Sequence, residues 1–275
     1  MADNAQHSAP GRSSRPAVEG EDAVLLEEKG NTLIIRINRP KARNAVNGAV
    51  AQGIEAGLDL LEKEQSLWVG ILTGSSEFFS AGADLKVINS GKADELMTKK
   101  GGFAGVAYRK RTKPLIAAVE GPALAGGTEI ALSCDLVAAG KSSRFGVPEV
   151  KRSLVAAGGG LFRLHRVFPQ NIANELIVTG DPIGAERAHS FGLVNVLAED
   201  GKALEAALKL AEQITANAPL AVQKSLALVD ELKSLSDKDA MQRSSEELMS
   251  LAGTEDFTEG LTAFIEKRPP NWKGR

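Results

Sequence analysis

Short apolar runs alternate with amphipathic stretches over the first two thirds of the chain. Apolar runs at residues 32–38, 67–74 and 114–121 predict buried strands, because consecutive apolar residues suit a strand that is covered on both faces. Between the first two runs, apolar residues recur at helical spacing after Asn47, a residue type that caps helices. This pattern predicts a helix from Asn47 to about Glu64.

The middle of the chain continues the alternation of strands and helices. A further helix is predicted to open near Asp84, and the polar stretch 92–112 also looks helical despite two glycines inside it. Residues 135–140 and 143–149 look like short strands. The segment 155–168 then passes from a glycine run into another helix. A strand, small residues and a helix thus follow one another several times.

The last quarter of the chain looks helical throughout. Residues 202–252 alternate apolar and charged residues with helical period, and Pro219 is placed to start a new helix. We therefore predict an α/β core over residues 22–201, followed by a helical C-terminal region over residues 202–275. The segment before the core, residues 1–21, is rich in Ser, Pro, Ala and charge, and it is expected to be a disordered leader.

Composition excludes several classes of partner. The 275 residues are 43% hydrophobic, and 33 Lys and Arg balance 35 Asp and Glu to a net charge of −2. This balance gives no electrostatic reason to expect nucleic acid as a partner. No apolar run approaches the roughly 20 residues of a membrane helix, so no membrane partner is expected.

Cysteine and histidine are scarce. The single Cys134 excludes an internal disulfide and suits a reducing compartment, from which we expect a cytoplasmic location. The three histidines, His7, His165 and His189, show no spacing typical of metal ligands. A metal site is therefore not expected.

Two glycine-containing loops carry the first chemical signal. The sequences AGADLK (81–86) and LAGGTE (124–129) each follow an apolar run and lead into a helix. Small residues let a ligand approach the backbone closely, and the first amides of a helix have no partner within it. Two such loops brought together would direct two N–H donors at one oxygen, which is an oxyanion hole.

Two glutamates in apolar surroundings carry the second signal. Glu129 follows the second loop and Glu149 lies in RFGVPEVK. Such a pair can hold a water molecule and move protons. Two plainer interpretations are an ordinary first-turn glutamate at position 129 and a solvated turn residue at position 149. Phosphate-loop, dinucleotide, serine-hydrolase and zinc-protease motifs are absent.

An ordered set of segments resembles the crotonase superfamily, specifically the enoyl-CoA hydratases. These segments are NRPKARNA (38–45), FFSAGADLK (78–86), KPLIAAVEGPALAGGTEIALSCD (113–135), FGVPE (145–149) and LTAFIEKRPPNWKGR at the C-terminus. The resemblance implies a spiral of repeated ββα units with a helical C-terminal region. It also implies an acyl-CoA thioester as the substrate, assembly as a homotrimer or a hexamer made of two trimers, and no cofactor besides the coenzyme A carried by the substrate.

The resemblance also assigns roles to residues. The amides of Ala83 and Gly126 would bind the thioester carbonyl, and Glu129 and Glu149 would be the two catalytic acids that add water across the double bond. The residues expected at the coenzyme A and the acyl chain are Lys41, Arg43, Ala81, Asp84, Leu85, Lys86, Ala157, Phe264 and Lys267, of which Phe264 and Lys267 would reach a neighbouring subunit's ligand.

Three alanines depart from the pattern of typical hydratases. Ala156 replaces a proline, while Ala125 and Ala157 replace glycines, and these changes bear on the substrate more than on the chemistry. The tail and the stretch after residue 163 also resemble the carnitinyl-CoA dehydratase branch. That branch and an enoyl-CoA isomerase remain alternative enzymes, and a non-catalytic acyl-CoA binding protein is an alternative of another class.

Overall fold

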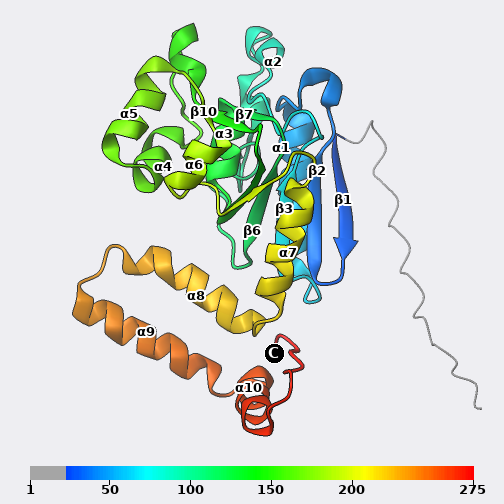
Figure 1. Cartoon of the computed structure of the whole chain (residues 1–275), viewed down its shortest axis with the longest axis vertical. Coiled ribbons are helices and arrows are strands. Elements are labelled where there is room, and N and C mark those ends of the chain that lie inside the picture. Colours follow the sequence, from blue (N-terminus) through cyan, green and yellow to red (C-terminus); the bar gives the residue numbers. More distant parts are fainter. Residues whose placement is uncertain (1–22) are drawn as a thin grey trace, which may run out of the picture.

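A six-stranded sheet forms the centre of the molecule, which is described by a computed structural model over residues 23–275 (Figure 1). The predicted leader, 1–21, lies outside the described residues. The strands, in their order across the sheet, are β1 (Val24–Lys29), β2 (Thr32–Ile37), β3 (Val69–Thr73), β6 (Leu115–Val119), β8 (Leu136–Gly140) and β11 (Val196–Ala198). Strands β1 and β2 pair antiparallel, and all the other neighbours pair parallel.

A smaller sheet lies beyond one end of the large one and comprises β7 (Pro122–Leu124), β9 (Arg144–Gly146) and β10 (Ile183–Gly184). Parallel bridges from Ser80 to Ala123 and from Val46 to Ala83 extend its pairing pattern. Each pass of the chain therefore runs through the large sheet, then through a short extended piece, and then into a helix. The helices reached in this way are α1 (Gly48–Lys63), α2 (Leu85–Asn89), α3 (Gly126–Leu132) and, after the 3-10 turn η3 (Pro148–Arg152), α4 (Gly160–Val167).

Apolar residues pack on both faces of the large sheet. The larger cluster of buried residues joins the sheet to α1, α3 and α4. On the opposite face, α7 (Ala203–Thr215) lies against β3, β6 and β8 and contributes the small residues Ala207 and Ala211. Close packing of this kind fixes where each strand ends, and the site described below is built at these strand ends.

The predicted strands and helices of the first third are confirmed. The three apolar runs contain β2, β3 and β6, and the Asn47 side chain caps α1 by accepting a hydrogen bond from the amide of Val50 at 3.0 Å. Asp84 caps α2 in the same way, through the amide of Lys86 at 3.1 Å. Strand β1 was not predicted, because five of its six residues are exposed and show no buried face.

The helix predicted over residues 92–112 is wrong. The segment forms a 3-10 turn η2 (Ala93–Leu96) and a tight hairpin of β4 (Met97–Thr98) and β5 (Gly102–Phe103). Gly102 (φ +65°), Ala104 (φ +54°) and Gly105 (φ +71°) have left-handed backbone conformations that no continuous α-helix contains.

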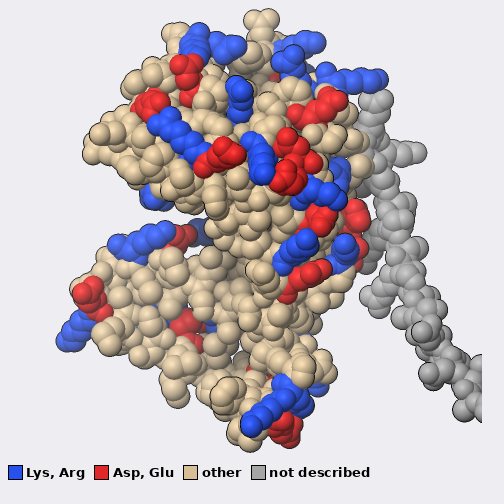
Figure 2. All heavy atoms as spheres, viewed as in Figure 1, with Lys and Arg blue, Asp and Glu red and all other residues tan. Residues whose placement is uncertain are grey.

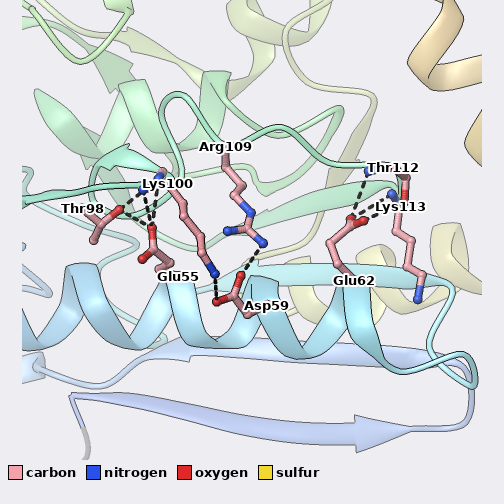
Figure 3. A network of polar contacts seen from close by, with 9 residues as sticks. Glu55, Asp59, Glu62, Thr98, Lys100, Arg109, Thr112 and Lys113 are labelled. Atoms are coloured by element: carbon pink, nitrogen blue, oxygen red, sulfur yellow. Dashed lines mark hydrogen bonds and ion pairs between the residues drawn. The ribbon is translucent and has the colours of Figure 1, made fainter.

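Carboxylates on α1 hold this segment in place (Figure 3). Glu55 accepts hydrogen bonds from the Thr98 hydroxyl at 2.5 Å and from the Gly101 amide at 2.9 Å. One and two turns along the same helix, Asp59 pairs with Lys100 and Arg109, and Glu62 accepts from residues 112 and 113. The acidic residues on α1 therefore impose the conformation of a segment some 45 residues away in the sequence.

The C-terminal helices form a separate lobe at one end of the molecule (Figure 1). Helices α5 (Gln170–Thr179) and α6 (Ala185–Ser190) still pack on the core, whereas α8 (Pro219–Leu232), α9 (Asp237–Leu251) and α10 (Glu255–Glu266) extend away from it. The lobe buries little on this chain, since only Pro219, Asp256 and Ala263 are buried in these three helices. Figure 2 shows a hollow between α8 and the core. No helix within residues 23–275 is long and apolar enough to cross a membrane.

Candidate active site

The two glycine loops meet at a single point. A Cβ on Gly82 (φ +84°) would lie 2.6 Å from the amide nitrogen of Gly126, so glycine is required for the two loops to come this close. Within residues 23–275, neither the Ala83 amide nor the Gly126 amide donates a hydrogen bond to the chain. Gly126 is the first residue of α3, whose dipole adds positive potential at its amide. Both predicted donors are therefore without a partner in the described chain, as binding of a ligand oxygen would require.

The residue before Gly126 is strained. Ala125 has φ +52° and ψ −126°, a conformation that favours glycine over any residue with a Cβ. Its amide donates to the carbonyl of Gly146 at 2.9 Å, and the Thr128 hydroxyl donates to the same carbonyl, also at 2.9 Å. These bonds to the β9 strand hold the turn despite its strain, so the first amide of α3 is fixed in direction.

Glu129 lies one turn into α3 and is 4% exposed, as its apolar neighbours in the sequence predicted. Its Oε1 accepts a hydrogen bond from the Gly160 amide at 2.9 Å. Burial raises the pKa of this carboxyl group, while the amides of Gly160 and Gly158 and the charge of Arg163 act in the opposite direction. A Cβ on Gly158 would lie 2.6 Å from Glu129 Oε2, so the glycine run lets the loop wrap around the carboxylate.

Glu149 opens the η3 turn directly after Pro148, and its carboxyl group faces different surroundings. Its Oε2 is buried and has no hydrogen-bond partner among the described residues. Burial and, to a smaller extent, the nearby charge of Glu129 together raise the pKa of Glu149 to about 7, against the opposing effects of its own backbone amide and of Arg152. An unpaired buried carboxyl oxygen is costly unless a ligand or a water molecule uses it.

Phe103 is a residue of the site that the sequence did not predict. It is 8% exposed and lies so close to both loops that a Cβ on Gly126 would be 2.5 Å from its ring and a Cβ on Gly158 3.0 Å from it. The ring thus forms a wall beside the Gly126 turn and the loop around Glu129. Because residues 92–112 were predicted to be helical, this role of Phe103 was not recognised. In the sequence, only the glycines of this segment indicated the turn that presents the ring.

Residues expected at the coenzyme A lie along the outer side of the first loop. The Ala81 amide donates to the carbonyl of Arg43 at 3.0 Å, which brings these two segments together. The side chains of Lys41, Lys86 and Leu85 are exposed, and the Arg43 guanidinium lies over the Phe78 ring. The Asp84 carboxylate has a structural role, because it caps α2 and also forms an ion pair with Arg39 at 3.1 Å.

Ala157 is exposed beside the glycine run, whereas Ala156 is buried against it. Phe264 and Lys267 lie at the end of α10, in the C-terminal lobe, and this single chain does not bring them to the glutamates (Figure 1). Phe264 is 85% exposed. A surface hollow of about 370 Å³ between β11 and α7 contains none of the predicted site residues.

Within residues 23–275, no three His, Cys, Asp or Glu side chains are grouped so that they could hold a metal ion. Burial raises the pKa of the Cys134 thiol to about 12, so this group is protonated at neutral pH. The groups gathered at the predicted site are carboxyl groups and backbone amides.

Comparison with known proteins agrees with this arrangement. The sequence model of the family described as "Enoyl-CoA hydratase/isomerase" matches residues 27–275. The chain is 39% identical over 264 residues to the enoyl-CoA hydratase EchA19 of Mycobacterium tuberculosis, covering 94% of this chain and 99% of that protein. It is 35% identical over 260 residues to a carnitinyl-CoA dehydratase of Escherichia coli K12, covering 92% and 99%.

Solved structures give the same result. A crystal structure of an enoyl-CoA hydratase from M. tuberculosis H37Rv superposes with a TM-score of 0.89 at 49% identity, covering 93% of this chain and all of that one. A carnitinyl-CoA hydratase from Mycobacterium avium gives 0.73 at 43% identity, with 93% and 100% coverage. The protein thus has the crotonase fold expected from the sequence. Within that class, the chain belongs to the enoyl-CoA hydratase/isomerase family.

Proposed function

We propose that the protein is an enoyl-CoA hydratase that adds water across the α,β double bond of an enoyl-CoA thioester to give a 3-hydroxyacyl-CoA. The observation that carries this proposal is the pairing of two unlike carboxyl groups with two amides that donate to no group of the described chain. Both carboxyl groups have a raised pKa, but Glu129 accepts a hydrogen bond from the Gly160 amide, whereas Glu149, with a pKa of about 7, has an oxygen without a partner among the described residues. One group suits a base and the other an acid at neutral pH.

The proposed reaction begins with the thioester carbonyl oxygen bound between the amides of Ala83 and Gly126. As water attacks Cβ, negative charge develops on this oxygen, and one such donor typically contributes about 2.7 to 4 kcal/mol of transition-state stabilisation. Glu129 as carboxylate accepts the water proton while the hydroxyl bonds to Cβ. Glu149 in its protonated form delivers its proton to Cα, and exchange with solvent returns both groups to their starting state.

The coenzyme A would lie along the first loop. Exposed Lys41 and Arg43 offer positive charge to its phosphates, and the stretch from Ala81 to Lys86 would run beside the adenine and the pantetheine arm. Leu85, exposed on this stretch, offers apolar contact. Asp84 would act indirectly, by holding α2 and Arg39 in place. Ala157 would lie near the attacking water and narrow the pocket by one methyl group.

The assembled enzyme is proposed to be a homotrimer or a hexamer, with residues 202–275 as the trimerisation region. In support, α8, α9 and α10 leave large apolar side chains exposed on this chain, as monomers rarely do. These side chains are Val229, Met241, Leu248, Met249, Phe257, Leu261, Phe264 and Ile265. In the assembly, Phe264 and Lys267 would approach a neighbouring subunit's coenzyme A. Light scattering on the purified chain tests this proposal, and a monomer would contradict it.

The expected cytoplasmic location rests only on the single, protonated thiol of Cys134.

The carnitinyl-CoA dehydratase branch shares the two-carboxylate chemistry but requires a site for a quaternary ammonium, to which Phe103 offers one aromatic face. An isomerase would need only one of the two acids, and a binding protein neither.

The experiment that tests the function measures loss of enoyl absorbance with crotonyl-CoA and with a trimethylammonium-bearing 2-enoyl-CoA, and gain of that absorbance with a 3-enoyl-CoA. We expect hydration of at least one 2-enoyl-CoA, with 3-hydroxyacyl-CoA as the product by mass. Binding of these esters without any turnover would support a binding protein instead, and conversion of the 3-enoyl ester alone would support an isomerase.

A further inference from the structure

We infer that Arg163 is a positioning residue that holds the loop around the Glu129 carboxylate. The inference rests on the proposed hydratase function and adds to it a residue outside the predicted site. Arg163 lies on α4, three residues after the Gly160 amide that donates to Glu129.

The guanidinium joins two segments that are distant in the sequence. Its Nη2 donates to the carbonyl of Ala107 at 2.6 Å, and its Nη1 donates to the carbonyl of Gly158 at 3.3 Å. Ala107 belongs to the segment that presents the Phe103 ring, and Gly158 belongs to the loop that wraps around Glu129. A planar group with several fixed donors can hold two carbonyls in this way, whereas a single ammonium holds them less rigidly.

The space for this bridge depends on the glycine run. Gly159 has φ +108°, and a Cβ there would overlap the Arg163 guanidinium. Gly158 lies close to Glu129 Oε2, and Phe103 lies close to both Gly158 and Gly126. A shift of the Arg163 guanidinium would therefore move the Glu129 carboxylate, the Phe103 ring and the Gly126 amide together. Misplacement of reacting groups by about 1 Å can cost about 100-fold in rate.

The charge of the guanidinium also acts on the carboxylate. Two ionisable groups face Glu129: Arg163 on α4 lowers the pKa of Glu129, whereas the charge of Glu129 raises the pKa of Glu149 on η3. Arg163 favours the ionised form of Glu129 and thereby lowers its pKa. The charges of Arg166, Tyr108 and Cys134 also act on the pKa of Arg163, and the charge of Arg152 acts on the pKa of Glu149.

The test compares Arg163→Met, Arg163→Lys and Arg166→Met. Arg166 is a matched control, because it lies on the same helix and stacks on the same Phe162 ring, at 4.8 Å against 4.7 Å for Arg163, but has no hydrogen bond to either carbonyl. We expect Arg163→Met to lower kcat by about 10- to 100-fold with little change in KM, and to move the acid limb of the pH profile to higher pH. Arg163→Lys should keep the acid limb near its wild-type position but lower kcat, and Arg166→Met should change neither.

A folded Arg163→Met variant with wild-type kcat and acid limb would overturn the inference. Should that variant fail to fold, wild-type kcat in Arg163→Lys would equally contradict the bridging role. Titration of the Glu129 carboxyl by ¹³C NMR, assigned through Glu129→Gln, requires no turnover. It therefore separates failure of this inference from failure of the hydratase proposal: an unchanged Glu129 pKa in Arg163→Met would contradict the electrostatic role whether or not the enzyme hydrates any ester.

Discussion

The regions around Glu129 and Glu149 contribute to one site, yet the chain surrounds the two carboxyl groups differently. Glu129 lies on a helix, and the loop over residues 158–160 closes around it with backbone amides. Glu149 lies on a short 3-10 turn, and one of its buried oxygens has no partner in the described chain. The proposed roles use this difference, with Glu129 as the base and Glu149 as the acid at the same pH.

The largest effect short of removing a glutamate is expected from filling the loop around Glu129. In Gly158→Ala, the new methyl group would lie within 2.6 Å of Glu129 Oε2 and displace the carboxylate. We expect kcat for crotonyl-CoA to fall by about 100-fold. Gly184→Ala is the matched control, because a Cβ there would meet no atom within 4 Å, and it should retain wild-type kcat. Equal activity of the two variants would show that the loop does not position Glu129.

The pH profile should distinguish the two carboxyl groups. Because the pKa of Glu149 is about 7, the free enzyme loses its acid as the pH rises through that value. We therefore expect kcat/KM for hydration to fall above about pH 7, approaching tenfold per pH unit. An acid limb at lower pH should report protonation of Glu129. A profile flat from pH 6 to 9 in steady-state assays would contradict the assignment of Glu149 as the acid.

The raised pKa of Glu149 should also affect the free energy of unfolding. A folded-state pKa raised from 4.5 to about 7 means that the native state binds the proton more tightly than the unfolded state. This contribution to stability is present at low pH and is lost as the pH rises through that window. Glu149→Gln should thus be more stable than wild type at pH 8, by about 1 to 2 kcal/mol after allowance for partial exposure, and nearly equal to it at pH 4.5.

Urea unfolding at the two pH values measures this difference. The expected result is a gap between variant and wild type that narrows on acidification, whereas a gap independent of pH would show that the effect is one of packing. Glu129→Gln serves as the contrast, since it removes an acceptor from the Gly160 amide and should not gain stability at pH 8 to the same extent.

The smallest effect concerns the turn before the Gly126 amide. Ala125→Gly removes the backbone strain of an alanine held at φ +52°. This gain should exceed the cost of the greater entropy of the unfolded chain, so the free energy of unfolding should rise by about 1 kcal/mol. Ala157→Gly is the control, because Ala157 does not have a positive φ, and it should gain nothing. Chemical denaturation of both variants checks the sign, and loss of stability in Ala125→Gly would contradict the strain.

The sequence predicted those parts of the molecule that depend on local pattern. Apolar runs predicted β2, β3 and β6, and the capping residues Asn47 and Asp84 predicted where α1 and α2 begin. The crotonase fold and the family expected from the quoted motifs are likewise confirmed. The roles of Glu129, Glu149, Ala83 and Gly126 remain predictions, although the chain brings the two loops together as those roles require.

The parts that could not be predicted depend on contacts distant in the sequence. Residues 97–113 are held by Glu55, Asp59 and Glu62 on α1, and no window around that segment contains these partners (Figure 3). For the same reason, the place of Phe103 beside Gly126 and the bridge made by Arg163 became visible only in the structure. In residues 97–113, hydrogen bonds to α1 therefore determine the conformation, although the local sequence pattern favours a helix.

The central claim is that Glu129 and Glu149 together hydrate an enoyl-CoA, and the most direct measurement follows crotonyl-CoA turnover in wild type, Glu129→Gln and Glu149→Gln. Calorimetric binding of a saturated acyl-CoA should accompany it, to show that each variant still has its site. We predict that each substitution lowers kcat by at least about 100-fold while ester binding persists. Turnover that survives either substitution in a protein that still binds the ester would contradict the two-glutamate account.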